Sequence, residues 1–195
     1  MTTIILIGPM NTGKSTVAKL LSEKLKLPRC ELDRVRWSYY KEIGYDDDVA
    51  SRIAKSDGGM LGLLQYWKPF EAYAVERVVA EHKGIIDFGA GHSVYEDETL
   101  FARVQQSLAP YPYVILLLPS PDLDESVAIV NTRLADMLQR EIGEVSDEVL
   151  KVNEQFVRHP SNHLLAKMVV YTKDKTPEET CAEILEILGK SGSMT

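Results

Sequence analysis

Short apolar runs alternate with longer amphipathic segments along most of the chain. The runs at residues 4–7, 30–32, 85–88, 114–118 and 168–171 have the length of strands, and the segments between them space their apolar residues as helices do. The dipeptide Ile85-Ile86 and the whole run 114–118 are continuously apolar, which is typical of parallel strands covered by helices on both faces. The pattern predicts an α/β fold with these two strands near the centre of the sheet.

The ends of the helices are marked by residue type. Pro28 closes the first helical segment, residues 126–139 have a helical pattern, and Thr176-Pro177 supplies an N-cap and a first-position proline for a last helix that is expected to end near Leu188. The small and polar residues 191–195 predict a flexible tail. With 195 residues and 45% hydrophobic content, the chain is expected to form a single domain over residues 1–190.

The composition argues against some classes of partner. Lys and Arg total 22 against 29 for Asp and Glu, and the resulting net charge of −7 disfavours an extended nucleic-acid-binding face. No apolar stretch approaches the ~20 residues that cross a bilayer, and no basic segment precedes a signal-like apolar core. We therefore expect a cytoplasmic protein that binds neither nucleic acid nor membrane. Cys30 and Cys181 lack metal-ligand spacing and are interpreted as reduced packing residues.

The most specific motif lies between the first strand and the first helix. Residues 8–15 read Gly-Pro-Met-Asn-Thr-Gly-Lys-Ser, a complete G-x-x-x-x-G-K-[ST] phosphate-binding loop. Glycines let such a loop curl so that its backbone N–H groups face a phosphate at the positive end of the following helix. Lys14 is expected to reach the β- and γ-phosphates, and the Ser15 hydroxyl to ligate Mg²⁺. The residues predicted to bind the nucleotide here are Gly8, Asn11, Thr12, Gly13, Lys14, Ser15 and Thr16.

The rest of the chain favours one branch of the phosphate-loop proteins. The Asn-Lys-x-Asp motif of GTPases is absent from the sequence, because its nearest candidate, Tyr171-Thr172-Lys173-Asp174, has the wrong spacing. Motor and transport ATPases are generally larger, although Ile85-Ile86-Asp87 resembles a short version of their strand-plus-acid signature. A small-molecule kinase is therefore the favoured class.

Four further segments, in chain order, resemble shikimate kinase and its relatives in the nucleoside monophosphate kinase superfamily. They are Glu31-Leu32-Asp33, Gly89-Ala90-Gly91, Arg158-His159-Pro160-Ser161-Asn162 and Thr172-Lys173-Asp174-Lys175-Thr176-Pro177. The resemblance is spread over most of the chain. It implies a P-loop kinase three-layer sandwich, in which a five-stranded parallel sheet of order 2-3-1-4-5 carries helices on both faces and a mobile lid lies near residues 133–157.

The resemblance also implies roles for these residues. Glu31 would steady Mg²⁺ through water, and Asp33 would hold the acceptor hydroxyl and help to deprotonate it. Gly89, Ala90 and Gly91 would let the substrate approach the backbone closely.

Further charged and nucleotide-binding positions complete the predicted site. Arg133 in the lid would stabilise the transferring phosphoryl group, with Arg140 as the second choice. Asp87 would face the metal through water or bond the substrate, and Arg158 would hold an anionic group. The segment that resembles the adenine loop of the family contributes Lys175 and Pro177.

One departure from the family bears on the substrate. Shikimate kinases bind the substrate carboxylate partly through a Phe-Arg dipeptide, whose counterpart here is Phe70-Glu71. A glutamate at this position would repel a carboxylate. The sequence thus predicts an ATP- and Mg²⁺-dependent kinase that phosphorylates a hydroxyl of a small polar metabolite and is not specific for shikimate. A nucleoside or nucleotide kinase and a non-catalytic ATP-binding regulatory protein are the alternatives.

Overall fold

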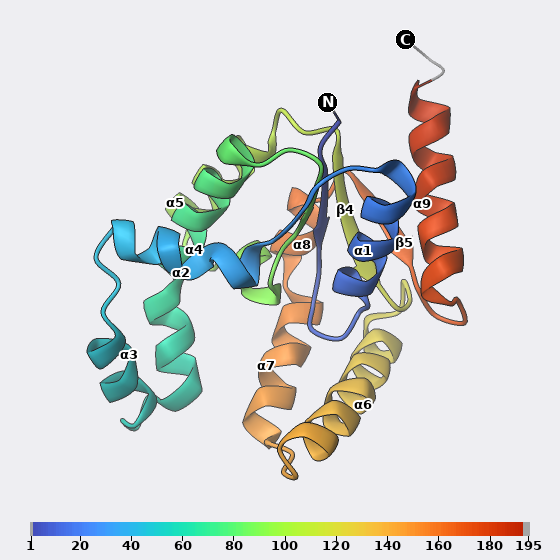
Figure 1. The fold of residues 1–195 in the computed structure, drawn as a ribbon. Helices are drawn as coiled ribbons and strands as arrows, with labels where there is room; N and C mark the ends of the chain where they lie inside the picture. The colour runs from blue at the N-terminus through green and yellow to red at the C-terminus, as the bar shows by residue number, and fades with distance from the viewer. Residues whose placement is uncertain (1, 193–195) are drawn as a thin grey trace.

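The computed structural model describes residues 2–192 and has the layered α/β architecture expected from the sequence (Figure 1). Each strand is followed by one to three helices, with a short 3₁₀ turn, η1, after the third strand. In order, the elements are β1 (Ile4–Ile7), α1 (Lys14–Leu25), β2 (Arg29–Glu31), α2 (Leu32–Glu42), α3 (Asp47–Ala54), α4 (Gly59–Glu81), β3 (Ile85–Asp87), η1 (Ala90–Ser93), α5 (Glu98–Leu108), β4 (Tyr113–Leu118), α6 (Leu123–Glu141), α7 (Asp147–Arg158), α8 (Pro160–Leu165), β5 (Met168–Tyr171) and α9 (Pro177–Gly192).

The sheet has five parallel strands in the order β2-β3-β1-β4-β5, so the predicted fold class and strand order are confirmed. β1 is the middle strand, and the apolar strands β3 and β4 flank it, as their composition predicted. In this register Glu31 lies opposite Asp87, and Asp87 lies opposite Leu6. The carboxyl ends of β1, β2 and β3 therefore meet at one edge of the sheet, where ligands bind in open α/β folds.

Alternate residues of each strand enter two separate hydrophobic layers. Ile5 and Ile7 belong to the layer beneath α2, α4, α5 and α8, whereas Ile4 and Leu6 belong to the layer beneath α1 and α9. All four side chains are completely buried. Burial of an isoleucine or leucine side chain contributes roughly 1.5–3 kcal/mol, so both faces of the central strand stabilise the sheet that positions the site.

The structure moves several boundaries. Asp33 lies in the first turn of α2, because the chain becomes helical directly after Glu31, whereas the sequence suggested the end of a strand. α6 starts earlier than expected because Asp122 caps it, accepting hydrogen bonds from the Asp124 and Glu125 backbone amides. α9 continues to Gly192, so residues 191 and 192 of the expected flexible tail are helical; residues 193–195 lie outside the described part of the chain.

The predicted lid region, 133–157, consists of the second half of α6, a connecting turn and most of α7. These helices pack side by side as a hairpin that projects beyond the edge of the sheet (Figure 1). Among residues 2–192, no helix combines the length and apolar character that a membrane span requires.

Candidate active site

The phosphate-binding loop has the backbone geometry that its glycines allow. Gly8 and Gly13 adopt φ angles of 136° and 91°, and Asn11 adopts 58°, a left-handed conformation that asparagine tolerates. At Gly8 a side chain would also meet the Leu117 carbonyl oxygen, because a Cβ there would lie 2.6 Å from it. α1 starts at Lys14, so its N-terminal amides open toward the curled loop.

Lys14 is held inside this loop. Its side chain is 8% exposed, and its Nζ donates a 2.6 Å hydrogen bond to the Pro9 carbonyl oxygen. Burial lowers the pKa of Lys14 to about 8, against the opposing charges of Asp33 and Asp87. At neutral pH the Lys14 side chain is still mostly protonated, so the loop contains a buried cation.

Of the remaining loop residues, one supports the loop itself, and the others have polar groups that a ligand could contact. The Thr12 hydroxyl is buried and donates to the Pro9 carbonyl, so it supports the curl of the loop. The Asn11 Nδ2 atom is buried and has no hydrogen-bond partner within residues 2–192, and Ser15 and Thr16 are exposed at the start of α1. A buried cation, an unpaired donor and exposed hydroxyl groups around a helix N-terminus fit a bound polyphosphate.

The two acidic residues predicted to act on Mg²⁺ share one arginine. Arg29 donates from Nε and Nη2 to the two carboxylate oxygens of Asp87, at 3.1 and 3.0 Å, and its Nη1 lies 3.3 Å from Glu31. Asp87 is almost completely buried. Within the described residues no three His, Cys, Asp or Glu side chains are grouped so as to hold a metal ion. The sequence did not single out Arg29, although its place beside Glu31 on β2 is a usable signal.

A cavity of about 280 Å³ opens beside the phosphate-binding loop. Met10 of that loop, Asp33 of α2 and the Ala90-Gly91 turn line it together, so three of the residues predicted to bind the acceptor converge here. The other lining residues are Arg36, Met60, Leu64, Trp67, Glu71, Val149, Val152 and Phe156. We call this space the acceptor cavity.

Two glycines set the shape of this cavity. A Cβ at Gly89 would overlap the Asp33 carboxylate, and a Cβ at Gly91 would overlap that of Glu71. Neither glycine has a positive φ angle, so the space for the two carboxylates is what requires glycine here. Gly89, which was predicted to let the substrate approach the backbone, thus packs against Asp33 and is not among the residues that line the cavity.

Asp33 is 57% exposed and lies between a cation and a neutral imidazole. Arg36 Nη1 donates to Asp33 Oδ1 at 3.1 Å, and His92 Nδ1 lies 3.9 Å from the same oxygen. Burial lowers the pKa of His92 to about 3, with Asp33 opposing and Arg36 reinforcing the shift, so this ring is neutral at physiological pH. Arg36 is therefore the cation next to Asp33.

Glu71 lies in the wall of the acceptor cavity, buried and paired. Lys68 donates to its Oε2 at 2.6 Å and also to the Gly91 carbonyl oxygen at 3.0 Å. The pair joins neighbouring turns of α4 to the glycine turn, and it neutralises the charge that would otherwise face the cavity. The sequence indicated that Glu71 stands at this position, but not that Lys68 balances its charge.

The remaining predicted residues lie around the loop and on the outer surface. Arg133 on α6 is exposed, and its Nη1 reaches the Asn11 carbonyl oxygen at 3.5 Å. Arg140 lies further along α6 and bonds the Asp136 carbonyl of its own helix. Arg158 ends α7 and is paired with Asp124 and Glu154, outside the lining of the acceptor cavity.

The segment that resembles an adenine loop connects β5 to α9. Lys175 is exposed and is paired with Glu183, and Pro177 is the first residue of α9. The Thr172 Oγ1 atom is buried and has no hydrogen-bond partner in the part of the chain that the structure describes. Asn162, which stands where the family has tyrosine, is fully buried and bonds Ser93 and the Phe156 carbonyl, so it joins α8 to η1.

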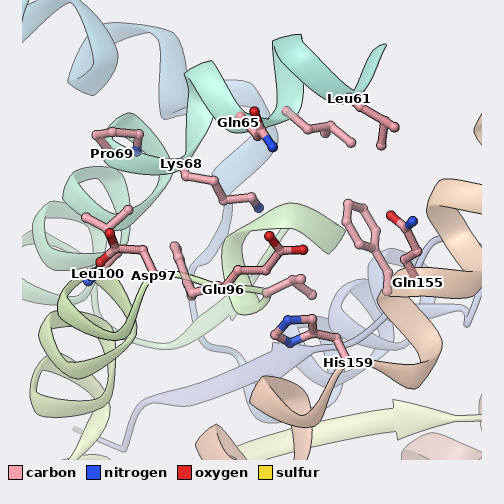
Figure 2. Close-up of a pocket in the computed structure, with 13 residues that line it drawn as sticks. Leu61, Gln65, Lys68, Pro69, Glu96, Asp97, Leu100, Gln155 and His159 are labelled. Carbon is pink, nitrogen blue, oxygen red and sulfur yellow. Dashed lines mark hydrogen bonds between the residues drawn. The ribbon is translucent and has the colours of Figure 1, made fainter. Parts of the chain in front are cut away.

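A second cavity, of about 500 Å³, lies between α4, α5 and α7. Figure 2 shows Lys68, Glu96 and His159 directed toward its interior. The two cavities share Leu64 and Phe156; Lys68 lines the second cavity, and its partner Glu71 lines the acceptor cavity. The second cavity contains none of the residues predicted for catalysis, so its larger volume does not identify it as the active site.

The sequence and the fold were compared with those of known proteins. No family model matches the sequence. A shikimate kinase of Dehalococcoides mccartyi is 29% identical over 190 residues, covering 96% of this chain and 93% of its own. Among solved structures, shikimate kinase from Acinetobacter baumannii in complex with shikimate has a TM-score of 0.66 at 18% identity and covers 98% of this chain and 94% of its own. A gluconokinase from Sinorhizobium meliloti has a TM-score of 0.55 at 14% identity, with 97% coverage of both chains.

These likenesses agree with the strand order and the phosphate-binding loop. The fold is that of the P-loop kinases. Within that class the chain is shikimate kinase-like, since curated relatives that match it over nearly its whole length are shikimate kinases, which transfer a phosphoryl group to a hydroxyl.

Proposed function

We propose that this protein is an ATP- and Mg²⁺-dependent kinase that transfers the γ-phosphoryl group to a hydroxyl of a small polar metabolite, and that shikimate is not its specific substrate. The observation that carries the proposal is the acceptor cavity, which Met10 of the phosphate-binding loop shares with Asp33 and Gly91. Phosphoryl transfer requires this arrangement, because donor phosphate and acceptor hydroxyl must meet in line.

The loop would neutralise the charge of the triphosphate. Its backbone amides and the buried Lys14 ammonium group would bind the β- and γ-phosphates, and Lys14 would leave the Pro9 carbonyl to do so. When bound, Mg²⁺ supplies positive charge to the phosphate oxygens. Ser15 would ligate it, and Glu31 and Asp87, held by Arg29, would act through water.

Asp33 would act on the acceptor. It is the exposed carboxylate of the acceptor cavity, and Arg36 fixes one of its oxygens, so the other is free to receive a hydroxyl proton. Ala90 and Gly91 would let the acceptor approach the backbone. Arg133, which reaches the loop from the lid, would stabilise the transferring group.

The two remaining roles are the anion-binding role of Arg158 and the adenine-binding role of Lys175 and Pro177. All three stay predictions. Arg158 would have to leave its partners Asp124 and Glu154 to reach an acceptor. Thr172, with its unpaired buried hydroxyl, supports a base-binding function for the segment before α9.

The buried Glu71 supports an acceptor other than shikimate. Its carboxylate occupies the cavity wall and its charge is already balanced by Lys68, so this part of α4 offers no free cation to a substrate carboxylate. We therefore expect shikimate to give a catalytic efficiency well below the ordinary metabolic range of about 10⁴ M⁻¹s⁻¹ and above.

The proposal is tested by ADP formation with ATP, Mg²⁺ and a panel of hydroxylated acids, polyols, nucleosides and nucleotides. We expect acceptor-dependent turnover that falls at least about 100-fold in Lys14→Ala and is unchanged in Lys19→Ala, an exposed lysine on the same helix. Turnover with nucleosides or nucleotides alone would indicate a nucleotide kinase. Tight ATP binding without turnover on the whole panel would indicate a regulatory protein.

A further inference from the structure

Arg36 lies in the wall of the acceptor cavity, on the turn of α2 that follows Asp33. Its side chain is 19% exposed. The guanidinium carbon lies 4.5 Å from the ring centre of Trp37 and 5.2 Å from that of Trp67, so two indole rings support the charged group. Such contacts hold an arginine in place without using its N–H donors.

One edge of this guanidinium group has no partner. Nη1 donates to Asp33, but Nε is buried and has no hydrogen-bond partner among the described residues. A buried donor without an acceptor is costly, and a native structure that retains one often reserves it for a ligand.

The same edge binds carboxylates elsewhere in this molecule. Arg29 uses Nε and Nη2 to bind both oxygens of Asp87, at 3.1 and 3.0 Å. Arg103 binds both oxygens of Glu76 in the same way, at 2.8 Å each. Arg36 lies in the wall of the acceptor cavity, and among the described residues no carboxylate accepts from both its Nε and its Nη2.

We propose that Arg36 is the specificity-determining residue for the acceptor, and that its Nε–Nη2 edge binds a carboxylate group of the substrate. This inference rests on the proposed function, which it extends by naming the substrate class as a hydroxylated carboxylic acid. The carboxylate would be anchored on α2, and Asp33, on the opposite end of the same guanidinium group, would receive the reacting hydroxyl.

The charges around Arg36 favour a singly charged group. Asp33 and Glu71 both line the cavity, and Lys68 is committed to Glu71. A phosphate dianion would meet one free cationic edge and two nearby carboxylates, whereas a planar carboxylate matches that edge with two parallel hydrogen bonds. Apolar side chains such as Leu64, Val152 and Phe156 complete the wall, so the carbon skeleton of the acid would lie against them.

The experiment compares matched pairs of acceptors in the wild-type protein and in Arg36→Gln. The pairs are shikimate and gluconate, each with its neutral amide, and glycerol 3-phosphate with glycerol. Arg36→Gln also removes the partner of Asp33, which affects every acceptor, so the measure is the difference within a pair. For the acid that the wild-type protein phosphorylates best, we expect kcat/KM to fall about 10- to 100-fold more than for its neutral amide, with the difference mainly in KM. Arg36→Lys should restore part of the loss.

Lys41→Gln is the matched control, because Lys41 is an exposed lysine at the end of the same helix. Equal turnover of acids and their amides, or an equal loss for both in Arg36→Gln, would overturn the inference and leave the kinase proposal standing. A preference for glycerol 3-phosphate over the acids would also overturn it, in favour of a phosphate.

A binding measurement separates this inference from the proposed function. Thermal shifts with the same pairs, in the presence of a non-hydrolysable ATP analogue, should show stabilisation by an acid in the wild-type protein and none in Arg36→Gln. Such binding without turnover would contradict the kinase and support the Arg36 site. Turnover of neutral acceptors with no Arg36-dependent binding of acids would support the kinase and contradict the Arg36 site.

Discussion

Lys14 and Arg36 are cations at the site that the protein buries in different ways. Lys14 is surrounded by its own loop and bonds a carbonyl oxygen, so its charge is poorly solvated. Arg36 is supported by indole rings and paired with Asp33 at one end. The first therefore has a shifted pKa, and the second has an unused hydrogen-bonding edge.

The pKa of Lys14 predicts a pH dependence of nucleotide binding. Because that pKa is about 8, the ammonium group that attracts phosphate is lost as the pH rises through this value. We expect the ATP affinity of the wild-type protein to fall between pH 7.5 and pH 9.5, as calorimetry would measure it. In Lys14→Met the affinity should be low and nearly independent of pH, and a parallel fall in both proteins would contradict the assignment.

The same shift has a consequence for stability, with the opposite sign. Lysine has a pKa of 10.5 in the unfolded chain and about 8 here, so between these values the unfolded state binds more protons. The free energy of unfolding of the ATP-free protein should therefore rise with pH across this window. Below pH 8, burial of the charged Lys14 lowers the free energy of unfolding by on the order of 3 kcal/mol. Lys14→Met would remove this penalty.

Gly89 provides a second prediction at the scale of a residue. In Gly89→Ala the new methyl group would overlap the Asp33 carboxylate, which is the mobile end of an exposed side chain and can move aside. We expect kcat to fall at least about tenfold with little change in melting temperature, because the catalytic carboxylate is displaced but the core is not. Gly58→Ala, where a Cβ would make only ordinary contact at 3.5 Å, is the control and should keep full activity.

At the scale of the elements, a chain of asparagines connects the phosphate-binding loop to the α6–α7 hairpin. The Met10 amide donates to Asn153 Oδ1 at 2.9 Å, Asn153 Nδ2 donates to Asn131 Oδ1 at 3.0 Å, and Asn131 Nδ2 donates to the Leu150 carbonyl at 3.1 Å. Asn153 is completely buried. The α6–α7 hairpin, where the lid was predicted, is thus attached to the loop through side chains that no sequence motif marks.

Removal of this connection should affect both stability and nucleotide binding. Asn153→Ala leaves the Met10 amide and the Asn131 Oδ1 atom without their partners, and such a loss typically costs about 1–3 kcal/mol. We expect that loss in urea unfolding, together with a weaker ATP affinity because the loop loses a support. Lys151→Ala, at an exposed position of the same helix, should change neither quantity. A destabilised Asn153→Ala that binds ATP normally would show that the connection serves folding alone.

At the scale of the whole molecule, the parallel sheet brings the acids of β2 and β3 beside the loop after β1. The segment before α9 then completes the region predicted to bind the nucleotide base. A ligand that contacts so many elements should stabilise the fold as a unit, because it binds only the folded state.

This leads to a prediction about the nucleotide. A non-hydrolysable ATP analogue at 100 times its Kd adds about 2.7 kcal/mol, or roughly 5–10 °C in Tm for a chain of this size. If the segment 172–177 reads adenine, the GTP analogue at the same concentration should give a smaller shift. Equal shifts in differential scanning fluorimetry would show that this segment does not select the base.

The elements and the phosphate-binding loop depend on contiguous residues, which is why the sequence by itself determined them. The apolar runs predicted all five strands to within one or two residues, and their composition correctly placed β3 and β4 beside the centre. The parallel order agreed with the order that the resemblance to shikimate kinase implied. The loop motif specified its own curl, because the glycines and the following helix lie within a few residues of one another.

Only the tertiary structure decided which side chains meet. Arg29 and Asp87 are 58 positions apart, and Met10 and Asn153 are 143 positions apart, so no local pattern relates them. Arg158 has the residue type of an anion-binding group, but the fold pairs it with Asp124 and Glu154, whereas Arg36 keeps a free edge in the acceptor cavity. Side-chain partners depend on the packing of elements distant in sequence. Residue type alone therefore indicated the phosphate-binding loop, but it could not indicate which arginine keeps a donor without a partner among the described residues.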